Sequence, residues 1–317
     1  MSEKLRIIFM GTPDFAVATL KNIIENDYEV VGVITAPDKP AGRGRKLQES
    51  AVKKYAIANN LNVLQPTNLK DPSFLEELKA LNANLNVVVA FRMLPKAVWS
   101  MPKHGTFNLH ASLLPDYRGA APINWAIING ETKTGATTFF IDEKIDTGAV
   151  ILQEETTIAP DDTAGVLHDK LMNTGAHLVV ETLKKIADGT TTTKIQPDST
   201  DLKTAYKLDK ENTKINWNAK TEDIYNLIRG LSPYPSAWSF LENREENPIN
   251  IKIYGAEMEI ILHNEQPGAI TADKKEVKVA TKDGYILLKE IQLPGKRKMA
   301  IKDILNGYEF TPDAKML

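Results

Sequence analysis

The order of apolar and polar residues in the first half of the chain is that of an α/β domain. Residues 5–10 form an apolar run, residues 15–24 carry apolar side chains at helical spacing, and residues 29–34 form a second run. Two strands joined by one helix lie parallel in a sheet, with a right-handed crossover. A further run at residues 85–90 is apolar at almost every position, as in a strand buried on both faces. These patterns predict a mostly parallel, Rossmann-like sheet, without a dinucleotide because the turn at residues 11–13 lacks G-x-G-x-x-G.

The second half of the chain has the pattern of a small β-barrel. A helix is expected at residues 221–231, and short alternating, β-branched runs follow it at residues 249–262, 268–271, 276–281 and 285–292. Such runs are typical of the oligonucleotide-binding (OB) fold, although sequence does not separate this fold from other small barrels. Residues 190–207, rich in threonine, lysine and aspartate, are expected to be a linker. The predicted domains are therefore residues 1–189 and 208–317.

Length and composition agree with two globular domains. The chain has 317 residues, of which 42% are apolar and 25% charged, and a net charge of −2. A membrane span would need about 18 consecutive apolar residues, and no run approaches that length. The first residues lack the features of a signal peptide, and the absence of cysteine excludes disulfides, thiolate catalysis and cysteine-bound metal. We therefore expect a cytoplasmic protein in which any contact with nucleic acid comes from local basic patches.

Residues 106–122, which read TFNLHASLLPDYRGAAP, contain the strongest candidates for chemistry. Asn108 and His110 are two residues apart, so in an extended strand their side chains share one face. The acidic turn at residues 141–149 could return the carboxylate of Asp146 to the same place. An amide that holds a developing oxyanion, an imidazole that moves a proton and a carboxylate that orients the imidazole suit acyl transfer without a covalent enzyme intermediate.

These residues also have ordinary structural interpretations. An isolated asparagine often bonds to the backbone of a nearby turn. Asp-Thr-Gly is a common turn sequence, in which Asp142 competes with Asp146 for a role at the site. Ser112 lacks the flanking glycines of G-x-S-x-G, so a hydrolase triad is not expected. The histidines include no pair at zinc-ligand spacing, so we predict no metal site; they are at positions 104, 110, 168, 177 and 263.

The segment N-L-H-A-S-L-L-P-D-Y-R-G-A-A-P, followed by D-T-G, resembles the signature of the 10-formyltetrahydrofolate-dependent formyltransferases. The resemblance extends from Ile7 almost to the C-terminus, and the SLLP element and the N-x-H pair are shared across this family. The segments TAPDKPAGRGRKL (residues 35–47) and GKRKM…DILNG (residues 295–307) are similar to the members that act on initiator tRNA. The resemblance implies transfer of the formyl group of 10-formyltetrahydrofolate to the α-amino group of methionine on initiator methionyl-tRNA.

The resemblance also implies roles for individual residues. The implied catalytic residues are Asn108, His110 and Asp146. Those expected to contact the folate co-substrate are Ser112, Leu113, Leu114 and Pro115, with Phe91, Met93 and Leu94. Those expected to bind tRNA are Lys39, Arg43, Arg45 and Lys46. Where relatives carry a glycine, this chain has Arg92 and is one residue shorter, so the resemblance does not fix the shape of the folate pocket. Arg118 could bind either a tRNA phosphate or a carboxylate of the folate tail.

Two other functions fit part of the pattern. A formyltransferase acting on a small amine, such as a sugar nucleotide or glycinamide ribotide, would share the catalytic residues. It would not need the basic segment at residues 35–47, which on its residues alone reads as a solvated loop. An RNA-binding module without catalysis would have no use for Asn108, His110 and Asp146 together. We expect a monomer with no membrane partner, whose second domain could offer tRNA a positive track of Lys289, Lys296, Arg297, Lys298 and Lys302.

Overall fold

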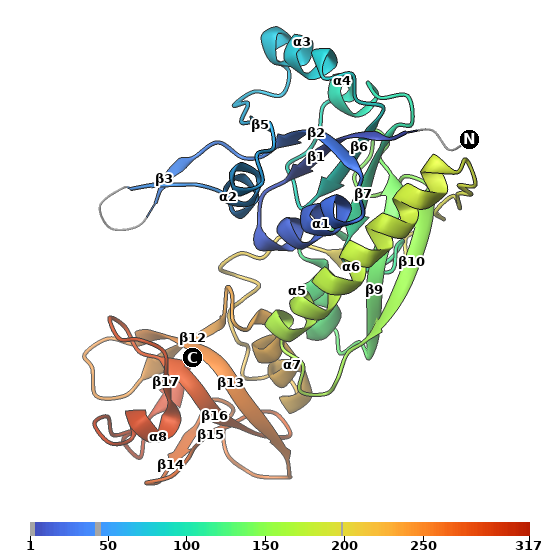
Figure 1. The fold of residues 1–317 in the computed structure, drawn as a ribbon. Helices are drawn as coiled ribbons and strands as arrows, with labels where there is room; N and C mark the ends of the chain where they lie inside the picture. Colours follow the sequence, from blue (N-terminus) through green and yellow to red (C-terminus); the bar gives the residue numbers. More distant parts are fainter. Residues whose placement is uncertain (1–3, 42–45, 198) are drawn as a thin grey trace. The chain divides into compact units, whose positions relative to one another are not determined.

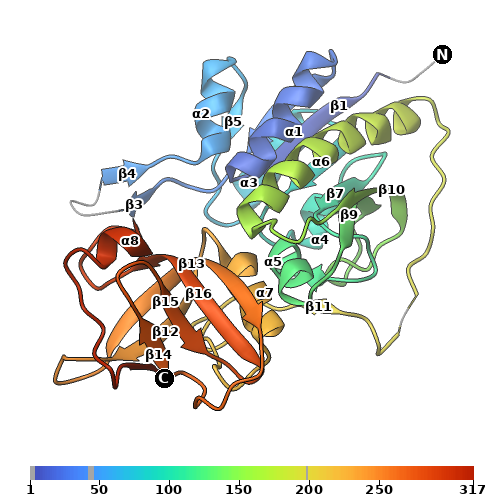
Figure 2. The ribbon, with the colours of Figure 1, turned by 90° about the horizontal axis from the view of Figure 1, so that it is seen from below.

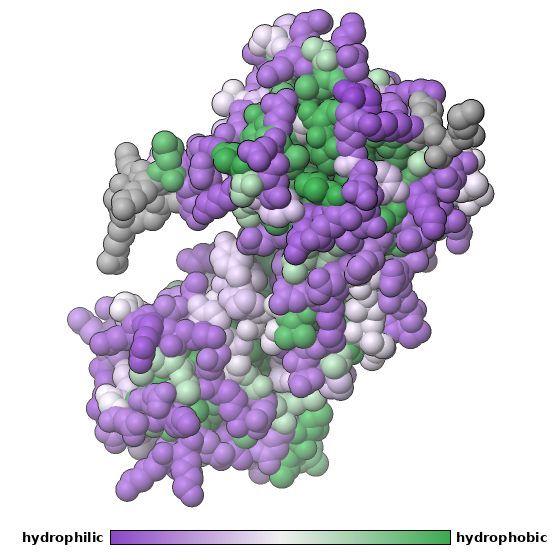
Figure 3. All heavy atoms as spheres, in the orientation of Figure 1, coloured by the Kyte–Doolittle hydropathy of each residue, from purple (hydrophilic) through white to green (hydrophobic). Residues whose placement is uncertain are grey.

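The computed structural model describes residues 4–41, 46–197 and 199–317 of the chain. These residues form two compact units (Figure 1, Figure 2). The first unit consists of Met1–Gly119, Thr134–Thr157 and His168–Thr204, and the second of Ala120–Lys133, Ile158–Leu167 and Ala205–Leu317. On the face shown in Figure 3, polar and charged residues cover most of the surface. No helix within the described ranges is long and apolar enough to cross a bilayer.

The first unit is built on a seven-stranded, mostly parallel sheet, which confirms the predicted fold class. Its strands are β1 (Arg6–Gly11), β2 (Glu29–Ile34), β5 (Val63–Leu64), β6 (Leu85–Val89), β7 (Thr106–His110), β9 (Lys133–Phe140) and β10 (Val150–Thr157). They lie in the order β10-β9-β7-β6-β1-β2-β5. The pairs β1–β2, β1–β6, β2–β5 and β6–β7 are parallel, and β7–β9 is antiparallel.

The helices of this unit pack on the sheet and on one another. They are α1 (Asp14–Glu25), α2 (Ala51–Ala58), α3 (Pro72–Ala80), α4 (Lys96–Trp99) and most of α6 (Ala164–Ala187). α1 and α6 lie side by side, and the ring of Phe15 meets that of His168 edge-on between them. Phe74 of α3 instead packs with Ile8 and Met10 of β1 in a buried cluster. Alternation along β1 therefore supplies apolar side chains to both faces of the sheet.

Residues 35–47 include a strand pair and are not the simple loop that their composition suggested. β3 (Lys39–Ala41) and β4 (Lys46–Gln48) form an antiparallel pair, with Lys39 opposite Gln48. The loop interpretation is wrong for these residues because the two strands satisfy each other's backbone groups. Arg43 and Arg45, two of the predicted tRNA-binding residues, lie outside the described residues.

The second unit is a nearly closed antiparallel barrel, as the alternating runs predicted. Its strands are β12 (Ala237–Glu242), β13 (Ile249–Ile260), β14 (Ile270–Ala272), β15 (Val277–Ala280), β16 (Gly284–Gln292), β17 (Met299–Ala300) and β18 (Lys315–Met316). They pair in the order β14-β15-β16-β13-β12-β18, with β17 on β16. The helices of this unit are α5 (Pro122–Ile128), α7 (Thr221–Leu231) and α8 (Ile301–Ile304). β8 (Arg118–Gly119) and β11 (Thr204–Ala205) form a separate short sheet.

Backbone hydrogen bonds between the two outer strands bring the barrel close to closure. The N–H of Met316 donates to the carbonyl oxygen of Gly268 over 2.8 Å, and that of Ile270 donates to Ala314 over 3.1 Å. Gly268 has a φ of +90°, and a Cβ at this position would lie 2.4 Å from the carbonyl oxygen of Met316. Glycine is the residue that tolerates both this conformation and this close approach. The fit of the outer strands therefore depends on Gly268.

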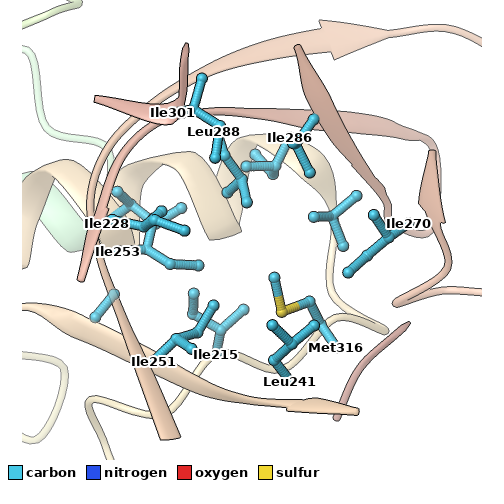
Figure 4. Packing of buried hydrophobic residues seen from close by; sticks show 14 of the residues in the cluster. Ile215, Ile228, Leu241, Ile251, Ile253, Ile270, Ile286, Leu288, Ile301 and Met316 are labelled. Carbon is cyan, nitrogen blue, oxygen red and sulfur yellow. The ribbon is translucent and has the colours of Figure 1, made fainter. Parts of the chain in front are cut away.

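The interior of the barrel is a continuous apolar core (Figure 4). Ile253 of β13, Leu288 of β16 and Met316 of β18 point into it. Ile228 of α7 belongs to the same cluster, so this helix helps to fill the barrel. Burial of such side chains contributes about 25 cal/mol per Å² of apolar surface. The alternating runs of the sequence therefore correspond to strands with one face in this core.

Candidate active site

Strand β7 presents the two predicted catalytic side chains on one face of the sheet. Asn108 and His110 alternate along it with Phe107 and Leu109, which are buried. Leu109 packs against α6, where a Cβ on Gly175 would lie 2.8 Å from it. The apolar residues therefore face the helix, and the polar pair faces the opposite side. His110 is 7% exposed, whereas Asn108 is half-buried and no hydrogen bond from another described residue engages its side chain.

The two ring nitrogens of His110 have different partners. Nε2 lies 2.8 Å from the carbonyl oxygen of Tyr117. A carbonyl oxygen only accepts, so Nε2 carries a proton, and in the neutral ring Nδ1 is then the unprotonated nitrogen. Nδ1 lies 3.8 Å from Oδ2 of Asp146. This separation is too long for a direct hydrogen bond but suits a bridging water or a group that reacts between them.

Asp146, rather than Asp142, is the carboxylate beside His110. Its Oδ2 also accepts from the N–H of Gly119 over 3.0 Å, and its side chain is 14% exposed. Asp142 instead closes its own turn, where it accepts from the N–H of Lys144 over 3.0 Å and from Thr147 Oγ1 over 2.8 Å. The two carboxylates of the turn are thus divided between local structure and the site.

The glycine of the D-T-G sequence allows this turn to return against the sheet. A Cβ on Gly148 would lie 1.7 Å from the carbonyl oxygen of Phe140, at the end of β9. The N–H of Phe140 also bonds to the carbonyl oxygen of Ala149 over 3.0 Å. The backbone at Gly148 therefore lies closer to the end of β9 than any side chain would permit. This close approach helps to place Asp146, two residues earlier in the same turn.

One hydroxyl on β9 holds the SLLP loop. Thr137 Oγ1 donates to the carbonyl oxygen of Ser112 over 2.6 Å and accepts from the N–H of Leu114 over 3.1 Å. Gln153 of β10 donates to the carbonyl oxygen of Leu114 over 2.8 Å. Ser112 is buried, and its hydroxyl donates to the carbonyl oxygen of Asp116. Leu114 is buried as well, so the parts of this loop left for a ligand are the half-buried Leu113 and Pro115 and the backbone.

A residue that sequence reasoning missed connects the two halves of the site. Gln196 is 8% exposed and lies in the segment expected to be a linker. Its Nε2 donates to the carbonyl oxygens of Asp146 (3.0 Å) and Gly148 (2.7 Å). Its Oε1 accepts from Nε (3.1 Å) and Nη2 (2.8 Å) of Arg118. A glutamine in a polar segment carries no pattern that would distinguish it, so sequence offered no signal.

The predicted folate-contacting residues after β6 divide between the core and the surface. Phe91 and Leu94 are half-buried and pack against the cluster that contains Ile8, whereas Met93 is 74% exposed. Arg92, the departure from the family pattern, donates to the carbonyl oxygens of Pro66 and Thr67. Its guanidinium also lies 5.7 Å from the centroid of the Phe91 ring. The arginine therefore ties this loop to the segment that follows β5.

Polar side chains anchor the base of the β3–β4 pair. Lys53 of α2 donates to Asp38, and the pair lowers the pKa of Asp38 and raises that of Lys53. Gln65 donates to the other oxygen of Asp38 and to the carbonyl oxygen of Ala36, each over 2.8 Å. Lys39 is exposed on β3 and Lys46 lies on β4. The two predicted tRNA-binding lysines that the structure describes thus lie on a hairpin with a fixed base.

Two other histidines of this unit contact polar side chains outside the site. His168 Nδ1 lies 3.0 Å from Asp169 Oδ1, and His177 Nδ1 lies 3.5 Å from the side-chain nitrogen of Asn22. Among the residues that the structure describes, no group of three or more histidine, cysteine, aspartate or glutamate side chains could hold a metal ion.

The chain is similar in structure to two solved formyltransferases. Its sequence identity to them is too low to indicate a shared function. A sugar 3N-formyl transferase, crystallised in the presence of dTDP and 5-N-formyl-THF, has a TM-score of 0.66 and 22% identity, with 93% of this chain and 100% of that chain covered. The N-formyltransferase from Helicobacter canadensis, in complex with folinic acid and dTDP-3-aminofucose, has a TM-score of 0.65 and 24% identity, over 90% and 98%. These two similarities support the fold alone.

Comparisons of the sequence with curated proteins give much higher identities. Methionyl-tRNA formyltransferase of Flavobacterium johnsoniae is 64% identical over 314 residues, which cover 99% of each chain. The protein of that name from Parabacteroides distasonis is 53% identical over 97% of each chain. The family model described as formyl transferase matches residues 4–183, and that of the formyl transferase C-terminal domain matches residues 207–309. The chain therefore belongs to the formyl transferase family.

Proposed function

We propose that the chain transfers the formyl group of 10-formyltetrahydrofolate to the α-amino group of methionine on initiator methionyl-tRNA, which gives N-formylmethionyl-tRNA for translation initiation. The observation that carries this proposal is the 64% identity, over 99% of both chains, to a relative named methionyl-tRNA formyltransferase. The approach of His110 and Asp146 on β7 and its neighbouring turn supports the chemistry.

In the proposed reaction, Asn108 stabilises the oxygen of the formyl group. The methionine amine attacks the formyl carbon, and the carbonyl oxygen gains negative charge in the tetrahedral intermediate. The amide N–H groups of Asn108 are not used by other described residues, so they can donate to this oxygen. One such donor contributes about 3–4 kcal/mol to transition-state stabilisation.

His110 is proposed to move the proton. The attacking amine loses a proton and N10 of tetrahydrofolate gains one as the C–N bond breaks, so one group that accepts and then donates serves both steps. Because Nε2 is bonded to the carbonyl oxygen of Tyr117, Nδ1 is the nitrogen that exchanges the proton. Asp146, 3.8 Å from Nδ1, would stabilise the charged ring directly or through a water.

The folate is proposed to bind along the SLLP loop and the loop after β6. Leu113 and Pro115 are half-buried, and Ser112 and Leu114 would shape the loop through their internal contacts. Phe91, Met93 and Leu94 would line the second side, of which Met93 has the most exposed side chain. The faces of the pterin ring are apolar enough to pack on leucine, methionine and proline, and its polar edge suits the backbone donors and acceptors between them.

The tRNA is proposed to contact both domains. Residues 1–189 would form the catalytic domain and residues 208–317 the tRNA-binding domain, with residues 190–207 between them. Lys39, Arg43, Arg45 and Lys46 would bind the acceptor end. On the barrel, Lys210 lies 5.4 Å and Lys214 5.7 Å from the centroid of the buried Trp238 ring, so two lysines gather over one side chain and could offer positive charge to phosphates.

The test offers three kinds of acceptor with 10-formyltetrahydrofolate. Charged initiator tRNA, charged elongator tRNA, and free amines such as an amino-sugar nucleotide or glycinamide ribotide are incubated separately with the protein. Formylation of charged initiator tRNA well above the other acceptors is expected. Turnover confined to a free amine would contradict the proposal and favour a small-molecule formyltransferase.

We further propose that the protein acts as a monomer in the cytoplasm. Light scattering on a sizing column at assay concentration should then give the 35.2 kDa of one chain. A mass of twice that value at this concentration would contradict the monomer.

A further inference from the structure

The amide of Gln196 donates two hydrogen bonds to the turn that carries Asp146. Both of its N–H groups are used, one toward the carbonyl oxygen of Asp146 (3.0 Å) and one toward that of Gly148 (2.7 Å). Its oxygen accepts from two nitrogens of the Arg118 guanidinium (3.1 and 2.8 Å). A buried amide with every donor and acceptor engaged holds its partners in a defined geometry.

The chemistry of the partners fixes the orientation of this amide. Carbonyl oxygens only accept and a guanidinium only donates, so the nitrogen of Gln196 must face Asp146 and Gly148 and its oxygen must face Arg118. An amide flipped about its axis would place like groups against each other at both ends. Glutamine is therefore specified by its contacts, because no other side chain of this length donates at one end and accepts at the other.

Gln196 belongs to a closed ring of contacts around the catalytic carboxylate. Arg118 bonds to Gln196, Gln196 bonds to the backbone of Asp146, and the Asp146 side chain accepts from the N–H of Gly119, the residue after Arg118. Asp146 itself has a φ of +55°, an uncommon conformation for a residue other than glycine, which persists where surrounding contacts hold it. Its carboxylate points toward His110 from this conformation.

We infer that Gln196 is a positioning residue for Asp146: it fixes the backbone turn that aims the Asp146 carboxylate at His110. The inference rests on the proposed function, in which Asp146 orients His110 and stabilises its charged form. Gln196 itself lies behind the turn and acts through it, with Arg118 as its anchor.

The first test compares Gln196→Glu with Ile195→Glu. The substitution at position 196 would keep the length of the side chain and the bonds from Arg118, but it would lose both donors and turn an oxygen toward two carbonyl oxygens. Misplacement of a catalytic group by about 1 Å can cost about 100-fold, so we expect kcat to fall by about 10- to 100-fold while both KM values stay within about two-fold. Ile195→Glu adds the same charge one residue away, on a side chain that is 85% exposed, and should retain wild-type kcat. Equal kcat values for the two variants would overturn the inference.

The second test is a double-mutant cycle with Gln196→Ala and Asp146→Asn. If Gln196 acts through Asp146, its truncation lowers kcat in the wild-type chain and has no further effect in a chain that already carries Asp146→Asn. Losses that multiply would show that the two residues act independently, and would overturn the inference. The alanine adds no charge and leaves room for water at the two carbonyl groups. The cycle therefore tests the role of Gln196 even if circular dichroism shows that the Gln196→Glu variant is unfolded.

The cycle also separates the inference from the function on which it rests. Wild-type turnover by Asp146→Asn would contradict the proposed catalytic role of the carboxylate. A slow Asp146→Asn variant beside a fully active Gln196→Ala variant would leave that role intact and overturn only the positioning role of Gln196.

Discussion

At the scale of single residues, two asparagines on neighbouring strands have opposite environments. Asn86 of β6 is 2% exposed, and its amide donates to the carbonyl oxygen of Val98 and to Thr106 Oγ1, over 3.2 and 3.1 Å. Asn108 of β7 has no such bond to any residue within the described ranges. A buried amide with partners supports the fold, and an amide without them is available to a ligand.

This contrast predicts different effects of alanine at the two positions. Asn108→Ala should lower kcat by about 100- to 1000-fold, the usual loss when one oxyanion donor is removed, with little change in the unfolding midpoint. Asn86→Ala should instead destabilise the protein by about 1–3 kcal/mol, because it removes two hydrogen bonds from a buried site. Formylation kinetics and urea unfolding of both variants give the comparison. If Asn108→Ala kept half of the wild-type kcat, the proposed role of the amide in catalysis would be contradicted.

The residue scale also shows where sequence reasoning ends. Alternation along a strand predicts that Asn108 and His110 share a face, and it needs no knowledge of the rest of the fold. The partners of Asp146 are different, since Gln196 is 50 residues from Asp146 and 78 from Arg118. No periodicity relates residues so far apart, and their meeting depends on how the segment after α6 runs back over the site.

At the scale of elements, the β3–β4 hairpin depends on the polar cluster at its base. Asp38 receives hydrogen bonds from Lys53 of α2 and from Gln65. Lys53 also lies 3.0 Å from Glu49. These bonds hold the residue before β3 to α2 and to the segment after β5, so the exposed Lys39 is presented from a fixed position.

Asp38→Asn should therefore raise KM for charged initiator tRNA several-fold and leave KM for 10-formyltetrahydrofolate unchanged. The substitution makes the protein more positive, which by itself would favour a polyanion, so a raised KM reflects the lost anchor rather than charge. Glu25→Gln makes the same charge change on exposed α1 and should leave KM for tRNA unchanged or slightly lower. A lower KM for tRNA in Asp38→Asn would argue against anchoring.

The start of α7 offers a test of stability. Asp283 Oδ1 accepts from the N–H and the hydroxyl of Thr221, the first residue of the helix, each over 2.8 Å. The bond from the Thr221 N–H, with that from its hydroxyl, lowers the pKa of Asp283. A carboxylate with a lowered pKa in the folded state stabilises above its ordinary pKa, and this contribution is lost as pH falls through the lower folded-state pKa.

Asp283→Ala should accordingly cost about 1 kcal/mol at neutral pH, the usual effect of losing a helix cap. The difference from wild type should shrink as the solution becomes acidic. Asp283→Asn keeps an acceptor but cannot titrate, so it should retain much of the stability with no such dependence on pH. Urea unfolding of the three proteins between neutral and acidic pH is the measurement, and a constant difference for alanine across this range would contradict the cap.

Elements with a clear period were predictable, and an element formed only through the pairing of two short strands was not. Residues 221–231 and 285–292 were expected as a helix and a strand, and the structure has Thr221–Leu231 and Gly284–Gln292. The β3–β4 hairpin was not predicted because its strands are three residues long and include proline and lysine, which are uncommon in strands. Pairing between the two strands overrides that preference.

At the scale of the whole molecule, the net charge of −2 requires a local source for any attraction to tRNA. On the barrel, Lys289 lies 2.7 Å from Glu257 and Lys298 lies 2.9 Å from Glu290, so two members of the predicted positive track are balanced by acidic neighbours. The basic hairpin and the lysines around Trp238 are therefore the stronger candidates for contact with phosphates.

Binding of initiator tRNA should weaken with salt, with a log–log slope of about −0.9 for each neutralised duplex phosphate. Lys39→Ala should make this slope shallower by about 0.9 if Lys39 contacts such a phosphate. Lys21→Ala removes the same charge from exposed α1 and should leave the slope unchanged. Titrations at several salt concentrations measure the slopes, and a flat dependence for the wild type would count against phosphate contacts altogether.

The division into units also depends on information that a linear pattern does not hold. The change from helical periodicity to alternation marked a second domain. Two earlier segments belong to the same unit as Ala205–Leu317, namely Ala120–Lys133 and Ile158–Leu167. Contacts such as the hydrogen bond from Arg229 to the carbonyl oxygen of Asp162 join them. Such contacts join segments that composition alone places in the first half.

The hydrogen bonds that join Gly268 to Met316 and Ile270 to Ala314 have a consequence beyond a single molecule. They occupy backbone groups to which the strand of another copy could otherwise add. In a concentrated sample this edge of the barrel is therefore a poor template onto which the strand of a second copy could add. The fit of one glycine against a carbonyl oxygen therefore helps to protect this edge of the barrel from pairing with another copy.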